Sequence, residues 1–296
     1  MPRINKCIEL LEQGQPVFST GASELSYDAG RALAKTEADF IMIEFEHHAF
    51  DMVGLSKFMK GLKDGGPTAS GHLTPAVVTS LPSNATTREE VLANAWQTRH
   101  VLATGVHGIL HTHVRDPEAA KAFVATARFP FQTLGRPTIP EGLRGGGGQG
   151  SPAPIWGVTP DEYVEIADPW PLNPRGELIL GVMIEDRHGL TVADVIASTP
   201  GFSFAQWGPG DMGMSFGYPA AHDPPYPPEM EAARNTVKAA LDKAGGFFFG
   251  SWNDRSMTEE QIAEHMINKI GFRMMGIRNR TFLTQARKIT GRTMPV

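Results

Sequence analysis

The chain has 296 residues, 41% of them hydrophobic, and its 27 Lys and Arg residues against 32 Asp and Glu residues give a net charge of −5. This composition can fill one large core, and a mildly acidic chain without a basic block is a poor candidate for binding nucleic acid. A single cysteine, Cys7, excludes an internal disulfide, and because the sequence shows neither a signal-peptide pattern nor the ~18 apolar residues of a membrane helix, we expect a cytoplasmic protein.

Eight short apolar runs recur along the chain, and their nearly continuous apolar character is typical of strands buried on both faces. They lie at residues 16–20, 40–44, 75–79, 108–111, 178–184, 202–207, 246–250 and 272–277. Amphipathic segments that suit helices lie between them, at residues 23–35, 56–63, 87–102, 117–127, 228–244 and 258–270. Asp116-Pro117 and the stretch 256–258 supply N-cap chemistry for two of these helices.

Strands that alternate with helices imply parallel pairing, and eight such units imply a closed barrel. We therefore predict an α/β fold, a single (β/α)8 TIM barrel over residues 1–296, with a doubly wound open sheet as the alternative. A Gly- and Pro-rich stretch at residues 130–176 breaks the rhythm between the fourth and fifth strands, and so long a stretch is usually a functional loop or disordered. We expect it to form an active-site loop on the active face, and residues 277–296 to form a C-terminal helix and tail.

Chemistry in such a barrel takes place at the C-terminal ends of the strands. Four of the predicted strands end in carboxylates or imidazoles, namely Glu44, Glu46, His47 and His48, then His111 and His113, then Glu185 and Asp186, and finally Asp211. A chance barrel would not be expected to place such residues at four strand ends. This face is therefore the predicted active site.

Glu185 and Asp211 are the predicted metal ligands. Glu185 follows an apolar run, and a buried carboxylate is costly unless a cation pairs with it. Asp211 follows a Gly-Pro-Gly turn that lets the backbone approach a ligand closely. Two carboxylates on adjacent strands suit a hard cation such as Mg²⁺ or Mn²⁺. The alternatives are an ion pair with Arg187 for Glu185 and a helix N-cap for Asp211.

His47 is the predicted general base, because the unperturbed pKa of histidine lies near the working pH. Asp51, four residues further on, could orient it, and Glu44 could hold a water on the metal. His111 and His113 are two residues apart and point to the same side if both belong to one strand. Such a pair could bind a metal or contact substrate, and core histidines bonded to backbone are the alternative.

Several sequence stretches resemble the HpcH/HpaI aldolase family: FIMIEFEHHAFD from Phe40, RFPFQTLGRP…GLRGGGG from Arg128, ILGVMIEDR from Ile179 and FAQWGPGDMGMSFGY from Phe204. The resemblance extends from Val17 to Ile277. It implies a barrel of the phosphoenolpyruvate/pyruvate-domain type and a metal-dependent class II aldolase that acts on pyruvate-type enolates with Mg, Mn or Co. It also implies a homo-oligomer, often a hexamer. The fungal macrophomate synthase, a related protein, joins decarboxylation to carbon–carbon bond formation.

The resemblance also implies roles for individual residues. The metal-binding Glu and Asp of the family fall on Glu185 and Asp211, its E-H motif on Glu46-His47, an acid before that motif on Glu44, and its R-G-x-G turn on Arg144-Gly145. From the strand ends and the resemblance together, we expect the substrate to contact His48, Thr79, His111, His113, Arg144, Met183, Trp207, Gly208 and Pro209.

Three positions depart from the family pattern. Thr79 stands where the pyruvate aldolases have a substrate-binding Arg, Met183 where they have Gln, and Ala103 where an Asp pairs with the base. Loss of the Arg removes a bidentate carboxylate clamp. We therefore predict a divalent-metal-dependent carbon–carbon lyase that stabilises an enolate of a small carbonyl substrate and is not a standard pyruvate aldolase. A metal-dependent decarboxylase or hydrolase for a bulky or aromatic substrate, and an inactive ligand-binding barrel, are the alternatives.

Overall fold

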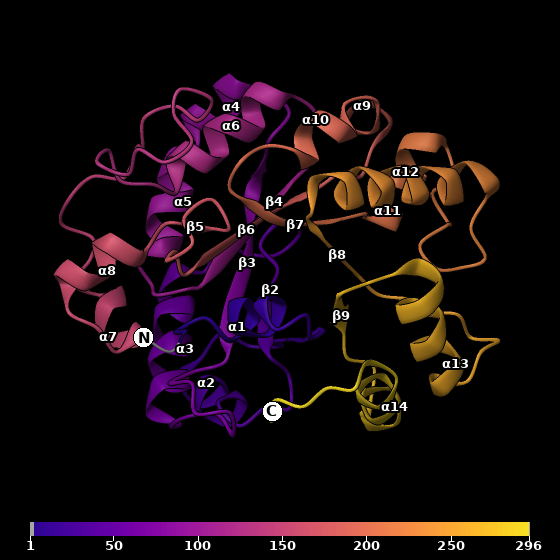
Figure 1. The fold of residues 1–296 in the computed structure, drawn as a ribbon, viewed down its shortest axis with the longest axis horizontal. Coiled ribbons are helices and arrows are strands. Elements are labelled where there is room, and N and C mark those ends of the chain that lie inside the picture. The colour runs from indigo at the N-terminus through magenta and orange to yellow at the C-terminus, as the bar shows by residue number, and fades with distance from the viewer. Residues whose placement is uncertain (1–2, 296) are drawn as a thin grey trace.

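The computed structural model describes residues 3–295 of the chain. Eight parallel strands form a closed barrel in which β4 pairs with β6 and β9 pairs with β1, and Figure 1 shows them at the centre with the helices around them. The strands are β1 (Val17–Gly21), β2 (Phe40–Ile43), β3 (Ala76–Asn84), β4 (Gly108–Thr112), β6 (Leu178–Met183), β7 (Phe202–Gln206), β8 (Phe247–Gly250) and β9 (Met274–Gly276). The predicted (β/α)8 barrel is confirmed, and the open doubly wound sheet is wrong because the sheet closes on itself.

The barrel interior is filled by apolar side chains that alternate along the strands, among them Phe40, Leu110, Phe204 and Phe249. The same cluster takes in the apolar face of α1 (Lys6–Glu12). Asn5 fixes this helix at the N-terminal end of the barrel, since its side-chain amide donates to the carbonyls of His107 and Glu177, which precede β4 and β6. The barrel interior is therefore closed at that end, and a reaction site can open only at the opposite mouth.

The other helices form the outer layer: α2 (Tyr27–Leu33), α3 (Met52–Asp64), α4 (Arg88–Ala93), α5 (Ala95–Leu102), α6 (Pro117–Thr126), α9 (Arg187–Thr191), α10 (Ala193–Ala197), α11 (Pro209–Phe216), α12 (Pro228–Ala244), α13 (Glu259–Glu264), the π-helical η1 (His265–Ile270) and α14 (Arg280–Thr290). Asp116 and Thr258 cap α6 and α13 through their side chains, as expected. The single helix expected at residues 87–102 is divided at Asn94, whose backbone leaves the helical region.

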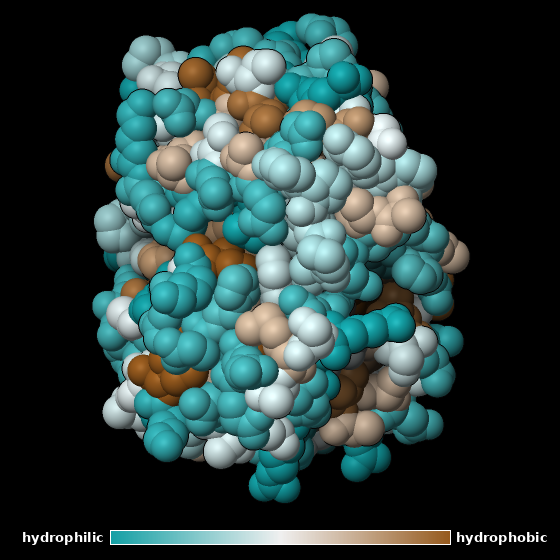
Figure 2. All heavy atoms as spheres, turned by 90° about the vertical axis from the view of Figure 1, so that its right-hand side faces the viewer, coloured by the Kyte–Doolittle hydropathy of each residue, from teal (hydrophilic) through white to brown (hydrophobic). Residues whose placement is uncertain are grey.

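The outer surface of the helices α12 to α14 is largely hydrophilic in Figure 2, and hydrophobic side chains show there in small patches and in a recess. Within residues 3–295, no helix is long and apolar enough to cross a membrane. The predicted C-terminal helix corresponds to α14, and the tail after it is tied back by Arg292, whose Nη2 donates to Asp39 Oδ1 at 2.6 Å. Residues 1, 2 and 296 of the predicted domain lie outside the described part.

The Gly- and Pro-rich stretch 130–176 lies at the N-terminal end of the barrel. It follows α6, which has already carried the chain back from the mouth, and it contains α7 (Pro152–Trp156), α8 (Pro160–Ile166) and β5 (Pro169–Trp170). β5 pairs with the first residues of β6, and the Trp170 indole N–H donates to Glu12 of α1. The expected location on the active face is therefore corrected: the stretch joins a helix to a strand, and such connections lie opposite the mouth.

His111 belongs to the wall of the barrel. β4 ends at Thr112, and His113 has a positive φ of 49°, so the backbone turns and the two histidines do not share a side. The ring of His111 packs edge-on against Phe123 of α6, with ring centroids 4.8 Å apart, and its Nδ1 accepts the Thr112 N–H. The predicted substrate contact of His111 is thus corrected to a buried structural role, the alternative that the sequence had left open.

The burial of His111 makes stability depend on pH. Burial lowers the pKa of His111 to about 3 from 6.5. Between these values the unfolded chain binds a proton that the folded chain does not, so stability falls as pH falls through this window. We expect the His111 contribution to lower the free energy of unfolding by about 2 kcal/mol between about pH 7 and about pH 5.

Urea unfolding of a His111→Gln variant at these two pH values measures that contribution. In His111→Gln, the free energy of unfolding should no longer contain the His111 contribution to the pH dependence. Phe123→Leu removes packing without removing a titrating group, so it should lower the free energy of unfolding equally at both pH values. An unchanged pH dependence in His111→Gln would contradict the assignment.

Candidate active site

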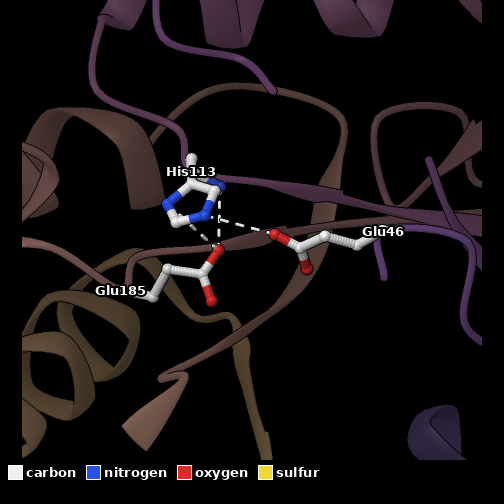
Figure 3. Close-up of side chains that lie close together, drawn as sticks. All are labelled: Glu46, His113 and Glu185. Carbon is white, nitrogen blue, oxygen red and sulfur yellow. Dashed lines mark hydrogen bonds and ion pairs between the residues drawn. The ribbon is translucent and has the colours of Figure 1, made fainter. Parts of the chain in front are cut away.

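Residues from four strand ends meet at the mouth of the barrel, where the strands finish. Glu46 follows β2, His113 follows β4, Glu185 follows β6 and Asp211 lies just beyond β7. Parallel strands in a barrel end at the same face, so residues far apart in the sequence become neighbours there. Figure 3 shows the imidazole of His113 facing the carboxylates of both Glu46 and Glu185. The fold thus gathers three carboxylates around one imidazole.

His113 makes the central contacts. Its Nε2 lies 3.2 Å from Glu46 Oε1 and 4.0 Å from Asp211 Oδ1. Its Nδ1 lies 3.5 Å from Asp186 Oδ2 and 3.7 Å from Glu185 Oε1. The contacts with the Asp186 and Glu46 carboxylates raise the pKa of His113 to about 10. The surrounding carboxylates thus favour the protonated form of the ring.

Glu185 is buried at the end of an apolar strand, with 2% of its surface exposed. Its Oε1 accepts the His113 backbone N–H at 2.9 Å. Its other oxygen lies against the backbone of Gly208, where a Cβ would stand only 2.2 Å away. Burial, reinforced by Glu46 and Asp211 and opposed by His113, raises the pKa of Glu185 to about 8. The surroundings of Glu185 therefore disfavour its charged form, and a divalent cation bound beside it would offset that cost.

Asp211 lies in the first turn of α11, which begins with Pro209 and has Gly208 as its N-cap. The N-cap alternative for Asp211 is therefore not what the structure shows. Its side chain is 34% exposed, so it faces the open side of the group. Among residues 3–295, the basic side chain at ion-pair distance from Glu185 is that of His113 and not that of Arg187.

The donor atoms fit a small divalent cation in two overlapping sets. The ligand atoms of Glu46, His113 and Glu185 lie within 4.8 Å of one another, and so do those of Glu46, His47 and Asp211. Buried Glu46 Oε1 has no hydrogen-bond partner in the described part of the chain. Carboxylate oxygens suit Mg²⁺ and Mn²⁺, and imidazole nitrogen suits later divalent ions. The two predicted ligands, Glu185 and Asp211, thus fall in different sets that share Glu46.

The residues after β2 place an exposed histidine beside this group. The His47 side chain is 63% exposed, and its Nε2 lies 3.8 Å from Glu46 Oε2. The backbone N–H of His47 donates to Glu44 Oε1 at 2.8 Å, and the imidazole of His48 pairs with the other Glu44 oxygen. Although burial opposes the effect, these hydrogen bonds lower the pKa of Glu44. His47 is therefore accessible from solvent, while Glu44 is held by both histidines.

Ser80, and not Thr79, faces the site from β3. Val77 and Leu81 pack in the outer cluster, and strand alternation turns Thr79 to the same side. The Ser80 hydroxyl accepts the Phe45 N–H at 2.7 Å and donates to Glu44 Oε1 at 3.3 Å. The predicted substrate contact of Thr79 is thus corrected by one position along the strand.

Three further predicted residues make contacts other than those expected. Asp51 caps α3 by accepting the Gly54 N–H at 2.8 Å, so the structure gives its carboxylate a role away from His47. The Trp207 ring packs edge-on against Tyr226, 5.1 Å away, in the outer cluster. The side chain of Met183 points into the barrel interior.

Arg144 lies in the stretch at the N-terminal end of the barrel and is 5% exposed. Its guanidinium stacks over the Phe129 ring at 4.3 Å, and its Nη2 donates to the Tyr163 hydroxyl at 3.0 Å. The prediction that Arg144 reaches a substrate at the mouth is therefore corrected to a packing role, because the stretch that carries it is at the other end.

The sequence placed Glu46 and Asp186 at the predicted strand ends but indicated no metal or His113 contact for either. Asp186 caps α9, and its Oδ2 also pairs with Arg115 Nε at 2.7 Å. The signal for Glu46 was present in the Glu-Phe-Glu-His run, where Glu44 and Glu46 alternate to one side. Asp186 follows Glu185 directly, and nothing in the pattern indicated that the turn of His113 would bring an imidazole to it.

Comparison with known proteins gives sequence relatives and structural neighbours. No family model matches the chain. The hydroxypyruvate/pyruvate aldolase of Paraburkholderia phytofirmans is 26% identical over 239 residues, which cover 79% of this chain and 78% of that protein.

Two solved structures share the fold. An HpcH/HpaI aldolase/citrate lyase family protein from Burkholderia cenocepacia superposes with a TM-score of 0.71 at 22% identity, over 97% of each chain. Macrophomate synthase superposes with a TM-score of 0.61 at 19% identity, over 98% of this chain and 87% of that one. The resemblance seen in the sequence is thus confirmed: the chain is similar in sequence to hydroxypyruvate/pyruvate aldolases and shares its fold with HpcH/HpaI aldolase family proteins.

Proposed function

We propose that this protein is a divalent-metal-dependent carbon–carbon lyase of the aldolase type that acts on a small carbonyl compound. The observation that carries the proposal is the convergence of Glu46, Glu185 and Asp211 around one imidazole at the mouth of the barrel. The sequence relatives named as aldolases support the same class of enzyme.

Glu185, Asp211 and Glu46 would hold the metal ion, for which Mg, Mn and Co are the candidates. A divalent cation bound there supplies a positive charge that polarises a substrate carbonyl and stabilises an enolate. The carboxylate of Glu185 would fix the position of the cation, because it is itself held by the His113 N–H and by the close approach of Gly208. Fixed groups of this kind need no rearrangement during the reaction.

His47 is the proposed acid–base residue. Its side chain is exposed at the mouth, next to Glu46, so it can exchange a proton with both substrate and solvent. Its backbone is fixed by the bond to Glu44, and Glu44 is itself held by Ser80 and His48. This arrangement supports a short proton-transfer path between His47 and a carbonyl compound at the metal site. His48 would contact the substrate from the same turn.

The substrate is proposed to be other than a plain hydroxy-oxo acid. Thr79 turns to the outer layer, so β3 presents a serine hydroxyl at the mouth where an arginine clamp would stand. A polar pocket of about 330 Å³ opens at the ends of β8 and β9 on the same face, lined in part by Ser251, Asn253 and Arg278. Such a pocket could take a polar extension of the substrate.

We further propose that the protein is cytoplasmic and assembles as a homo-oligomer, a hexamer being the family's usual form. Buried Cys7 agrees with a reducing compartment. Gel filtration with light scattering measures the assembly directly.

The lyase proposal predicts that Glu185→Gln loses activity. The carboxamide is nearly isosteric but carries no charge, so kcat/KM should fall on the order of 10³-fold. Metal-supplemented protein is incubated with a panel of hydroxy-carbonyl compounds, and in reverse with 2-oxo acids and aldehydes, with products identified by NMR. Glu165→Gln, on exposed α8 at the other end of the barrel, is the matched control.

Full activity in Glu185→Gln would contradict the metal role of this residue. Release of carbon dioxide without an aldehyde would instead favour the decarboxylase, and stoichiometric binding without turnover would favour an inactive ligand-binding barrel.

The close approach of Gly208 predicts a second effect. In Gly208→Ala the new methyl group would stand 2.2 Å from Glu185 Oε2, so the carboxylate must move. We expect the affinity for Mn²⁺, measured by calorimetric titration, to fall at least about 10-fold. Gly145→Ala, where a Cβ meets nothing within 4 Å, should bind Mn²⁺ as the unaltered chain does. Equal affinities in the two variants would show that Glu185 does not hold the ion.

A further inference from the structure

We infer that His113 is a direct ligand of the proposed metal ion, through Nε2, so that the centre is a mixed nitrogen–oxygen site. The inference rests on the proposed metal site but not on the reaction. It predicts a metal-ion preference that differs from that of an all-carboxylate site, because imidazole suits Co²⁺, Ni²⁺, Cu²⁺ and Zn²⁺ better than Mg²⁺.

The position of the ring is the first observation. Nε2 lies 3.2 Å from Glu46 Oε1 and 4.0 Å from Asp211 Oδ1, so this nitrogen points between two of the proposed oxygen ligands. Its side chain is only 17% exposed, whereas that of His47 is 63% exposed. A ligand that is already in place and shielded from solvent loses little freedom when it binds an ion.

The second observation is the carboxylate behind the ring. Nδ1 lies 3.5 Å from Asp186 Oδ2, and Asp186 is itself fixed by the N–H groups of His188 and Gly189, both at 2.9 Å, and by Arg115. A metal-binding histidine usually turns its second nitrogen toward a carboxylate, which orients the ring. Here Nδ1 is at ion-pair distance from Asp186 and makes no hydrogen bond within residues 3–295. Asp186 thus leaves Nε2 as the nitrogen available to an ion.

The third observation is the backbone of His113. A φ of 49° is unusual for a residue other than glycine and costs free energy, and such residues concentrate at functional sites. The conformation is held on the C-terminal side by Val114, which is buried and donates its N–H to the Met183 carbonyl at 3.2 Å. The strained turn is what moves the imidazole off the β4 wall and into the mouth.

Pulsed EPR of the Cu²⁺-loaded full-length protein tests this ligand directly, because the remote nitrogen of a coordinated imidazole modulates the electron-spin echo. His113→Asn is the main variant, since asparagine tolerates the left-handed backbone and provides oxygen in place of a ring nitrogen. His113→Gly, which adopts a positive φ freely, is the second variant if the first fails to fold. His47→Asn tests the competing imidazole, and His100→Asn on the outer wall controls for adventitious binding.

We expect nitrogen modulation in the unaltered protein, in His47→Asn and in His100→Asn, and its loss in His113→Asn. The Zn²⁺ affinity of His113→Asn should fall at least about 10-fold, with a smaller change for Mg²⁺. Modulation that persists in His113→Asn, or vanishes in His47→Asn instead, would overturn the inference while leaving the metal site in place. Failure of the unaltered protein to bind any divalent ion would overturn the metal site and this inference together.

Discussion

Repulsion among neighbouring carboxylates is the constraint on which the mouth of this barrel depends. The parallel strands of the barrel end at one face and bring together Glu46, Glu185 and Asp211. Burial raises the pKa of Glu185 to about 8. Within the chain, the His113 imidazole contacts the carboxylates of Glu46 and Glu185 (Figure 3). Clustered carboxylates are stable as anions only beside a cation, and this requirement supports the proposed metal centre.

Much of the fold could be predicted from the sequence. Strands buried on both faces give nearly continuous apolar runs, and these are distinct from the amphipathic pattern of the helices between them. The predicted run at residues 202–207 corresponds to β7 (Phe202–Gln206), and the helix expected at residues 228–244 is α12. The location of the stretch 130–176 could not be predicted as easily. Its sequence shows that it is irregular, but the end of the barrel at which it lies depends on α6 having already reversed the chain.

The candidate site was predictable in part for similar reasons. Glu185 stands at the end of an apolar run, which marks it in the sequence, and the geometry around it is consistent with a ligand role. A shift of one residue along a strand, however, turns a side chain to the opposite face. Thr79 and Ser80 exchanged roles in this way, and the pairing of His111 with His113 failed because β4 ends between them. The left-handed turn at His113 has no signal in a single sequence.

A crystal structure of the protein loaded with Mn²⁺, with its anomalous-scattering map, tests the metal centre most directly. The map should show one strong peak at the mouth of the barrel, within bonding distance of both Glu185 and Asp211. A peak elsewhere, or a map without a peak at this site under saturating Mn²⁺, would contradict a metal-dependent centre.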